Sequence, residues 1–250
     1  MKISVITAVY NSHVTLADAL DSALAQDHPD TELIVIDGAS TDGTLEVIQR
    51  YAERIAHRVS EPDRGVYDAL NKGLHLATGE VVGFLHSDDR YADDRVLSRI
   101  AAAFADPAVD ACYGDLVYVR QDDPGHVVRY WRAGPYCSRL LSRGWMPPHP
   151  TFYARRALYQ RLGGFDLDYE IAADYDCLLR FLSTGQITCA YIPEILIHMR
   201  LGGISNRSLG KILQKSREDY QALRRHQVGG LSTLLMKNLQ KLPQFFKDRH

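Results

Sequence analysis

Short apolar runs, each followed at once by polar residues, constrain the fold of the first half of the chain most strongly. The runs span residues 3–9, 32–37 and 81–85 and are rich in Val, Ile and Leu. Apolar residues at helical spacing mark the segments 13–25, 42–51, 66–77 and 93–104. Strands that alternate with helices of about ten residues form parallel βαβ units. The sequence therefore predicts an α/β fold with a Rossmann-like, mostly parallel sheet flanked by helices.

The polar residues that follow the three strands identify the candidate ligand site. They are Tyr10-Asn11-Ser12 after the first strand, the segment 37–42 after the second and the segment 86–89 after the third. Open α/β sheets bind ligands at the carboxyl ends of their strands. We therefore expect these three segments to meet at one edge of the sheet.

The second half of the chain has a different pattern. Runs of β-branched and aromatic residues at 111–119 and 127–131 flank the turn 122–125 and predict a hairpin. A Pro-rich loop is expected at 144–150, a helix at 173–182, and two short strands at 187–192 and 194–199.

Composition restricts the partners and the location. The formal net charge is −2, which gives no reason to expect nucleic acid as a partner. The N-terminus alternates like a strand instead of forming a signal peptide, and no run of about 18 apolar residues exists. A cytoplasmic location is the expectation. Cys112, Cys137, Cys177 and Cys189 form no CxxC pair, and we expect them to be reduced and buried.

Asp88 and Asp89 directly follow the third strand. Adjacent carboxylates repel one another unless a cation offsets their charge, and hard oxygen ligands suit Mg²⁺ or Mn²⁺. Such an ion would also bind the oxygens of a diphosphate. The alternative is an acidic loop that caps the helix beginning near Asp93, and the pair alone does not decide between the two.

Other charged residues extend this candidate site. Asp37 ends the second strand, and no basic, Gly-rich loop is present to bind phosphate. Arg64 and Lys72 are candidates for neutralising a diphosphate, although Arg64 also suits an exposed turn. Asp174 stands at the start of a predicted helix, where a carboxylate serves either as a cap or as a general base.

Five motifs, taken in order along the chain, resemble those of the family 2 glycosyltransferases. They are SVITAVYN at 4–11, DGASTDGT at 37–44, NKG at 71–73 with ATGE at 77–80, FLHSDD at 84–89, and GGFD at 163–166 followed by ADYD at 173–176. Each motif is short, but the five together are specific, and the resemblance covers about residues 2–206.

The resemblance implies a GT-A fold and an inverting transfer from a nucleoside-diphosphate sugar to a saccharide or lipid-linked acceptor, as in bacterial surface-polysaccharide assembly. A UDP-sugar is the expected donor, with GDP and dTDP as alternatives. The implied donor-binding residues are Thr7, Ala8, Tyr10, Asn11, Asp37, Arg64 and Asp88. Asp89 is the implied direct ligand of Mn²⁺ or Mg²⁺, with Asp88 nearer the ribose and phosphates, and Asp174 is the implied catalytic base.

Two positions depart from the family pattern. The family often has a second Asp after the second strand, which contacts the base, but this chain has Gly38. The metal motif often begins with Asp, but this chain has His86. His86, His149 and His198 remain open between a place in the site and a packing role.

The resemblance also suggests the domain organisation. Residues 1–206 form the expected catalytic domain, with a nucleotide-sugar half at about 1–110 and an acceptor half at 111–206. Residues 207–250 form a basic helical extension with ten Lys or Arg against three Asp or Glu, about +7 by simple counting. Its segment 231–246 places Leu234, Leu235, Leu239, Leu242 and Phe246 on one face. The extension either packs on the catalytic domain or lies on anionic lipid at the inner face of the plasma membrane.

Other α/β enzymes fit less well. A dinucleotide-dependent oxidoreductase needs a Gly-rich turn after the first strand, and residues 9–12 contain no glycine. An α/β-hydrolase needs a GxSxG elbow, and a nucleotidyltransferase usually has a Gly-rich basic loop, neither of which is found. A non-catalytic sugar or nucleotide-sugar binding protein remains the alternative from another class.

Overall fold

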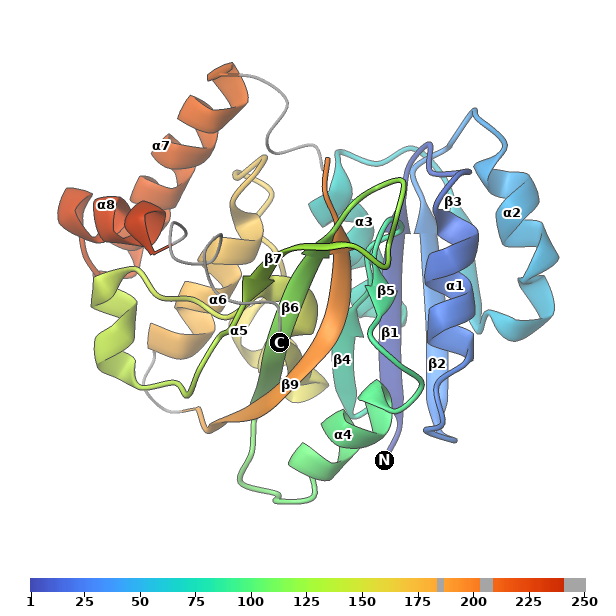
Figure 1. The fold of residues 1–250 in the computed structure, drawn as a ribbon, viewed down its shortest axis with the longest axis horizontal. Helices are drawn as coiled ribbons and strands as arrows, with labels where there is room; N and C mark the ends of the chain where they lie inside the picture. The colour runs from blue at the N-terminus through green and yellow to red at the C-terminus, as the bar shows by residue number, and fades with distance from the viewer. Residues whose placement is uncertain (184–186, 203–208, 241–250) are drawn as a thin grey trace.

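A computed structural model describes residues 1–183, 187–202 and 209–240 (Figure 1). The strands are β1 (Ile3–Val9), β2 (Thr31–Asp37), β3 (His57–Ser60), β4 (Val81–Phe84), β5 (Arg90–Tyr91), β6 (Ala111–Val119), β7 (Val127–Trp131), β8 (Tyr153–Arg155) and β9 (Cys189–Arg200). The α-helices are α1 (Leu16–Leu24), α2 (Thr44–Arg50), α3 (Val66–Leu76), α4 (Val96–Ala103), α5 (Arg156–Leu162), α6 (Ala173–Ser183), α7 (Leu209–Arg225) and α8 (Leu231–Leu239). Short 3₁₀ helices are η1 (Ala52–Arg54), η2 (Ser138–Arg143) and η3 (His149–Thr151).

The described strands form one sheet in the order β3-β2-β1-β4-β8-β6-β9-β5, with β7 paired to β6. The pairs β1–β2, β1–β4 and β2–β3 are parallel, which confirms the βαβ prediction for the first half. All seven residues of β1 are buried. Burial on both faces is typical of a parallel strand covered by helices on either side.

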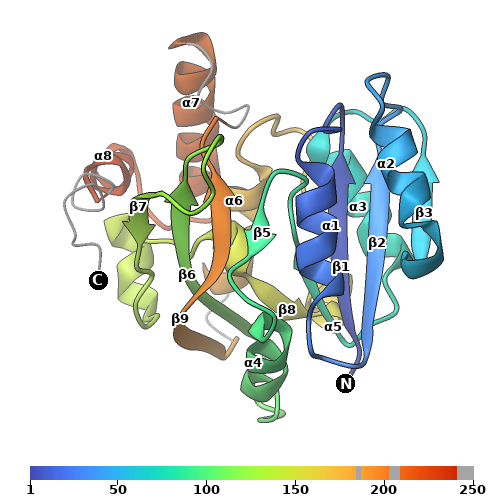
Figure 2. The same cartoon turned by 45° about the vertical axis from the view of Figure 1, so that its right-hand side comes forward.

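Two helical layers cover the sheet, as the turned view in Figure 2 shows. Side chains alternate along a strand, so Val5 and Val9 of β1 pack with α1, α2 and α4, while Ile6 and Ala8 pack with α3, α5 and α6. Apolar residues recur along one face of α1, and those that are buried are Leu16, Ala19, Leu20 and Ala23. The core therefore lies on both faces of β1.

The second half adds strands of mixed direction. The hairpin of β6 and β7 is confirmed, and β8 pairs antiparallel with both β4 and β6. The prediction of two short strands near the end was wrong, because β9 is continuous and parallel to β6. Pro193 has no N–H to donate, and the pairing shifts register there: Gly114 pairs with Ile192, and Asp115 pairs with Ile195.

Several elements were not predicted from the sequence. They are β3, β5, β8 and α5, of which the three strands have only two to four residues. The residues of β3 alternate between half-buried and exposed, because it is an edge strand. Such segments are too short, or too polar, to show a hydrophobic period.

The cysteines are only partly buried. Cys112 and Cys177 are buried as predicted, Cys189 is half-buried and Cys137 is exposed. The prediction of burial was wrong for Cys137 because it lies just before η2, in a loop on the surface.

The C-terminal helices α7 and α8 lie beside α6 and η2, at the end of the molecule opposite β3 and α2 (Figures 1 and 2). The predicted common face of α8 was wrong, because Leu234 packs against the core while Leu235 and Leu239 are exposed. Leu242 and Phe246 lie outside the described residues. Among the described helices, none is both long and apolar enough to span a bilayer.

Candidate active site

The ends of β1, β2 and β4 meet through hydrogen bonds between their loops. The N–H of Asn11, a residue with a left-handed φ of 48°, donates to Ser40 Oγ at 2.9 Å. The N–H of Thr41 donates to Asn11 Oδ1 at 2.9 Å, which ties the first two loops together in both directions. Ser87 Oγ after β4 donates to Ser12 Oγ at 2.9 Å. The structure thus brings the three predicted polar segments to one edge of the sheet.

Asp37 lies inside this edge and is fully buried. Its carboxylate accepts hydrogen bonds from the N–H and hydroxyl of Ser40 and from the hydroxyl of Ser60 at 2.6 Å. Buried carboxylates require such partners. Asp37 therefore holds the loop that follows β2 from beneath, and its oxygens are not exposed to a ligand.

The other residues predicted to bind the sugar-nucleotide donor have different surroundings. Thr7 and Ala8 are buried at the end of β1, and Thr7 Oγ1 has no hydrogen-bond partner among the described residues. Tyr10 is 63% exposed, so its ring is open to a flat ligand at the edge of the sheet. Arg64 is exposed and lies 3.5 Å from Asp68.

Asp63 is a site residue that the sequence reasoning missed. A Cβ on Gly38 would lie only 2.4 Å from Asp63 Oδ2, so the Asp63 carboxylate occupies the space beside Gly38. Asp63 Oδ1 accepts the N–H of Gly65 at 2.8 Å, and the side chain is partly exposed. The Asp63 carboxylate, from the loop before α3, thus lies beside position 38, where the family often has a second Asp. The sequence offered two clues to this residue: Gly38 stands where the family often has Asp, and an Asp is present in the loop before α3.

Asp88 and Asp89 have contrasting environments. Asp88 is partly exposed, whereas Asp89 is fully buried. Asp89 Oδ1 accepts the N–H of Arg200 at 3.3 Å, and Asp89 Oδ2 has no partner among the described residues. Burial, and then the charge of Asp88, raise the pKa of Asp89 well above its ordinary value. Arg200 also holds this loop, since its Nη1 donates to the Asp88 carbonyl at 3.1 Å and its Nη2 pairs with Asp18 at 2.5 Å.

These residues fit a divalent cation that a diphosphate helps to bind. Within residues 1–183, 187–202 and 209–240, no three His, Cys, Asp or Glu side chains converge as a complete metal site. Mg²⁺ is commonly held by one or two carboxylates together with substrate phosphates and water. A buried carboxylate oxygen without a partner, such as Asp89 Oδ2, is favourable only when a proton or a cation balances its charge.

Asp174 lies at the start of α6 and is partly exposed. Its Oδ1 accepts the N–H of Tyr175 at 2.8 Å and lies 3.2 Å from the Tyr67 hydroxyl. Burial alone would raise the pKa of Asp174, but His149, Lys215, the Tyr175 N–H and Lys237 lower it, and the net pKa is below its ordinary value. The carboxylate is therefore ionised near neutral pH, as a base must be.

His149 links Asp174 to the metal motif. It is buried, with its ring centroid 5.5 Å from that of Phe84 and 6.2 Å from that of His86. Burial lowers the pKa of His149 to about 4, against the opposing charge of Asp174. The two groups interact: the charge of Asp174 favours protonated His149, and protonated His149 lowers the pKa of Asp174. His198 lies elsewhere, opposite Arg90 in the pairing of β5 with β9.

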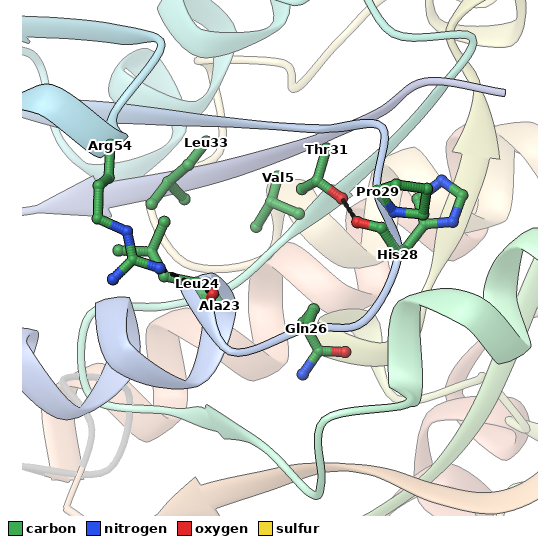
Figure 3. Close-up of a pocket in the computed structure, with 9 residues that line it drawn as sticks. All are labelled: Val5, Ala23, Leu24, Gln26, His28, Pro29, Thr31, Leu33 and Arg54. Carbon is green, nitrogen blue, oxygen red and sulfur yellow. Dashed lines mark hydrogen bonds between the residues drawn. The ribbon is translucent and has the colours of Figure 1, made fainter.

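A cavity of about 160 Å³ lies away from these residues (Figure 3). It is lined by Val5, Ala23, Leu24, Gln26, His28, Pro29, Thr31, Leu33 and Arg54. Thr31 begins β2, so this cavity is near the amino ends of the strands, and none of the predicted site residues lines it. The carboxylates and the unpartnered Thr7 and Asp89 oxygens place the candidate site at the opposite edge.

Comparisons with known proteins agree with this geometry. The family model described as glycosyl transferase family 2 matches residues 4–166. A "PGL/p-HBAD biosynthesis glycosyltransferase" of Mycobacterium bovis (strain BCG / Pasteur 1173P2) is 32% identical over 213 residues, covering 83% of this chain and 80% of the relative.

Two solved structures share the fold. S. aureus TarS 1-349 in complex with UDP-GlcNAc has a TM-score of 0.69 at 22% identity, over 91% of this chain and 66% of that one. Mannosyltransferase PcManGT from Pyrobaculum calidifontis, in complex with GDP-Man and Mn²⁺, has a TM-score of 0.67 at 24% identity, over 98% of this chain and 73% of that one. This chain spans 44% of a longer TarS structure. These likenesses show a GT-A fold.

The matched motifs lie on the strand ends that the structure brings together, and the family model covers well over half of the chain. The chain therefore belongs to glycosyl transferase family 2.

Proposed function

We propose that this protein is a metal-dependent, inverting glycosyltransferase that moves a sugar from a nucleoside-diphosphate sugar to a saccharide or lipid-linked acceptor. The observation that carries the proposal is the Asp88-Asp89 pair, whose buried Asp89 Oδ2 has no partner among the described residues and needs a compensating charge. Relatives named for glycolipid biosynthesis, and neighbours with UDP-GlcNAc or with GDP-Man and Mn²⁺, support the donor class and a setting in surface glycan assembly.

The chemistry at Asp174 follows from its position and charge. Asp174 accepts the proton of the acceptor hydroxyl as that oxygen bonds to the anomeric carbon, and the bond from this carbon to the diphosphate breaks on the opposite face. A single displacement inverts the anomeric centre. Asp88 and Asp89 would hold a divalent cation, which would supply electrostatic stabilisation of the leaving diphosphate.

The nucleoside is assigned to the edge formed by the loops after β1 and β2. The exposed Tyr10 ring offers a stacking surface, and the Asp63 carboxylate beside Gly38 can accept a base N–H, as from uracil or guanine. Asp37 and Asn11 contribute by holding these loops in place. Arg64 pairs with Asp68 and Lys72 pairs with Glu61, and both add positive charge near Asp63.

Nucleotide binding should depend on the metal. UDP, GDP, dTDP and CMP are compared by thermal unfolding with and without Mn²⁺, and one diphosphate is expected to raise the Tm by roughly 5 °C when present far above its Kd. Asp88→Asn should abolish the metal-dependent part of the shift, whereas Asp122→Asn, in the exposed turn after β6, should retain it. Well-folded protein that shows no shift with any nucleotide would instead support a sugar-binding protein without transferase activity.

Asp63→Asn should weaken and broaden nucleotide recognition. The substitution removes the negative charge from one acceptor of the base N–H, and a charge-assisted bond is worth about 1.5–3 kcal/mol, so affinity should fall roughly tenfold or more. Isothermal titration of the preferred nucleotide with Mn²⁺ measures the change. Glu61→Gln, on the same loop and paired with Lys72, is the matched control. An unchanged affinity and nucleotide ranking in Asp63→Asn would remove Asp63 from the base site.

Asp174→Asn should abolish transfer without affecting donor binding. The amide keeps the shape of the side chain but cannot take up the proton, so turnover should fall roughly 10²-fold or more. Turnover is measured as release of nucleoside diphosphate from the preferred sugar nucleotide, with water and with p-nitrophenyl hexosides as acceptors. The Mn²⁺-dependent thermal shift should stay as in the unaltered protein. Normal turnover in this variant would exclude Asp174 as the base.

We also propose that the protein acts at the cytoplasmic face of the membrane and contacts anionic lipid through the α8 face, defined as Leu231, Leu235, Met236 and Leu239. These four side chains are exposed, with 72% and 62% exposure for the first two. The extension 207–250 is about +7 by simple counting. Exposed apolar residues in a basic segment suit an anionic bilayer surface, where a lipid-linked acceptor would lie.

The full chain should co-sediment with vesicles of phosphatidylcholine and phosphatidylglycerol at 3:1, and much less with pure phosphatidylcholine. The double variant Leu231→Glu, Leu235→Glu should reduce the bound fraction several-fold, because each change removes apolar area and adds a repelled charge. Leu45→Glu, an exposed site on α2, is the control. Equal sedimentation of all variants would refute the lipid contact, and dimerisation without vesicles that the double variant abolishes would assign the face to a second copy.

A further inference from the structure

The backbone that leads into α6 is held by a residue of the C-terminal extension. Glu218 of α7 is buried, and its Oε2 accepts the N–H groups of Ile171 at 2.8 Å and Ala172 at 2.9 Å. A carboxylate beside the N-terminus of a helix is favourable, because the helix dipole is positive there. Glu218 therefore holds, from a distant part of the chain, the two residues that directly precede the helix whose second residue is Asp174.

The same turn is held from the other side by the nucleotide-binding half. The hydroxyl of Tyr67 on α3 lies 2.7 Å from the Ile171 carbonyl oxygen and 3.2 Å from Asp174 Oδ1. Ile171 is thus bonded through its N–H to α7 and through its carbonyl to α3. The position of Asp174 follows from both contacts, because Asp174 stands only two positions after Ala172.

Neighbouring side chains fix the Glu218 carboxylate itself. Gln214, one turn earlier on α7, donates to Glu218 Oε1 at 3.0 Å and to Glu170 Oε2 at 2.7 Å. Lys211 pairs with Glu170 as well. Both Glu218 oxygens therefore have partners, so its side chain is held in one orientation.

The extension also contacts the two residues that follow Asp174. Lys237 of α8 lies 3.3 Å from the centroid of the Tyr175 ring and 2.7 Å from Asp219 Oδ2, and both charged side chains are buried. His226, just after α7, lies 2.7 Å from the buried Asp176. Burial raises the pKa of Asp174, whereas His149 and then Lys215 and Lys237 of the extension lower it. The extension thus contacts the start of α6 on one side.

We propose that Glu218 is a positioning residue for sugar transfer, which orients Asp174 through the Ile171-Ala172 turn. The proposal rests on the proposed role of Asp174 as the base. It makes the C-terminal helices part of the catalytic unit in addition to any contact they make with lipid. Transfer is sensitive to such orientation, because a displacement of about 1 Å at a reacting group can lower a rate roughly 10²-fold.

The test separates turnover from donor binding. Glu218→Ala should lower kcat for release of nucleoside diphosphate by roughly 10- to 100-fold, with the donor KM and the Mn²⁺-dependent thermal shift of the preferred nucleotide nearly unchanged. Glu218→Gln keeps an acceptor oxygen for the two N–H groups and should recover most of the turnover. Arg224→Ala, exposed on the same helix, is the control and should match the unaltered protein. If the Ala variant does not fold, the Gln variant and Tyr67→Phe, which removes the other contact to the turn, are compared in its place.

A double-mutant cycle with Asp174→Asn distinguishes positioning from general loss of structure. If Glu218 acts through Asp174, Glu218→Ala should cause little further loss of kcat in the Asp174→Asn background. The same holds for Tyr67→Phe where it is used in place of Glu218→Ala. Losses that multiply, or normal kcat in the unaltered background, would overturn the positioning role. Full turnover in Asp174→Asn alone would instead refute the base assignment, so the two failures are distinct.

Discussion

Parallel pairing of β1 with β2 on one side and β4 on the other is the constraint on which the site depends. The register places Val9 beside Asp37 and Ile6 beside Phe84, so the three strands end close together. The loops then bond to one another through Asn11, Ser12 and Ser87. Because the central strand is buried on both faces, a slip in register would disrupt side-chain packing in both cores, and so the core fixes the loops relative to one another.

The carboxylates at this edge have unequal surroundings, which divides their roles. Asp37 accepts hydrogen bonds from Ser40 and Ser60 inside the protein, so its carboxylate holds the loop after β2. Asp89 is buried with one oxygen lacking a partner among the described residues, so it favours a bound cation or proton. Asp174 has lysines near it and an ionised carboxylate, which suits a base. Different environments give neighbouring carboxylates different pKa values, so one can balance the charge of a cation while another accepts a proton.

The second half of the chain carries Asp174, the proposed base. Strands β6, β8 and β9 extend the sheet, and α6 packs over them with α5 and α3. The turn before α6 is bonded to Tyr67 in the first half and to Glu218 in the extension, residues 46 or more positions away from it along the chain. The position of Asp174 therefore depends on three separate parts of the sequence, and the basic extension is tied to it by buried polar contacts.

The sequence by itself determined the βαβ alternation, the polar strand ends and the family, because strand and helix periods and the short motifs are local. It also indicated Asp88, Asp89 and Asp174 as candidate site residues, because their motifs stand directly beside a predicted strand or helix. Only the tertiary structure decided that Asp37 is enclosed by Ser40 and Ser60, that Asp63 fills the space beside Gly38, and that β9 runs unbroken past Pro193. It also decided that Glu218 binds the turn that directly precedes the helix of Asp174. These facts concern residues distant in sequence, whose contacts have no period and depend on how the layers pack.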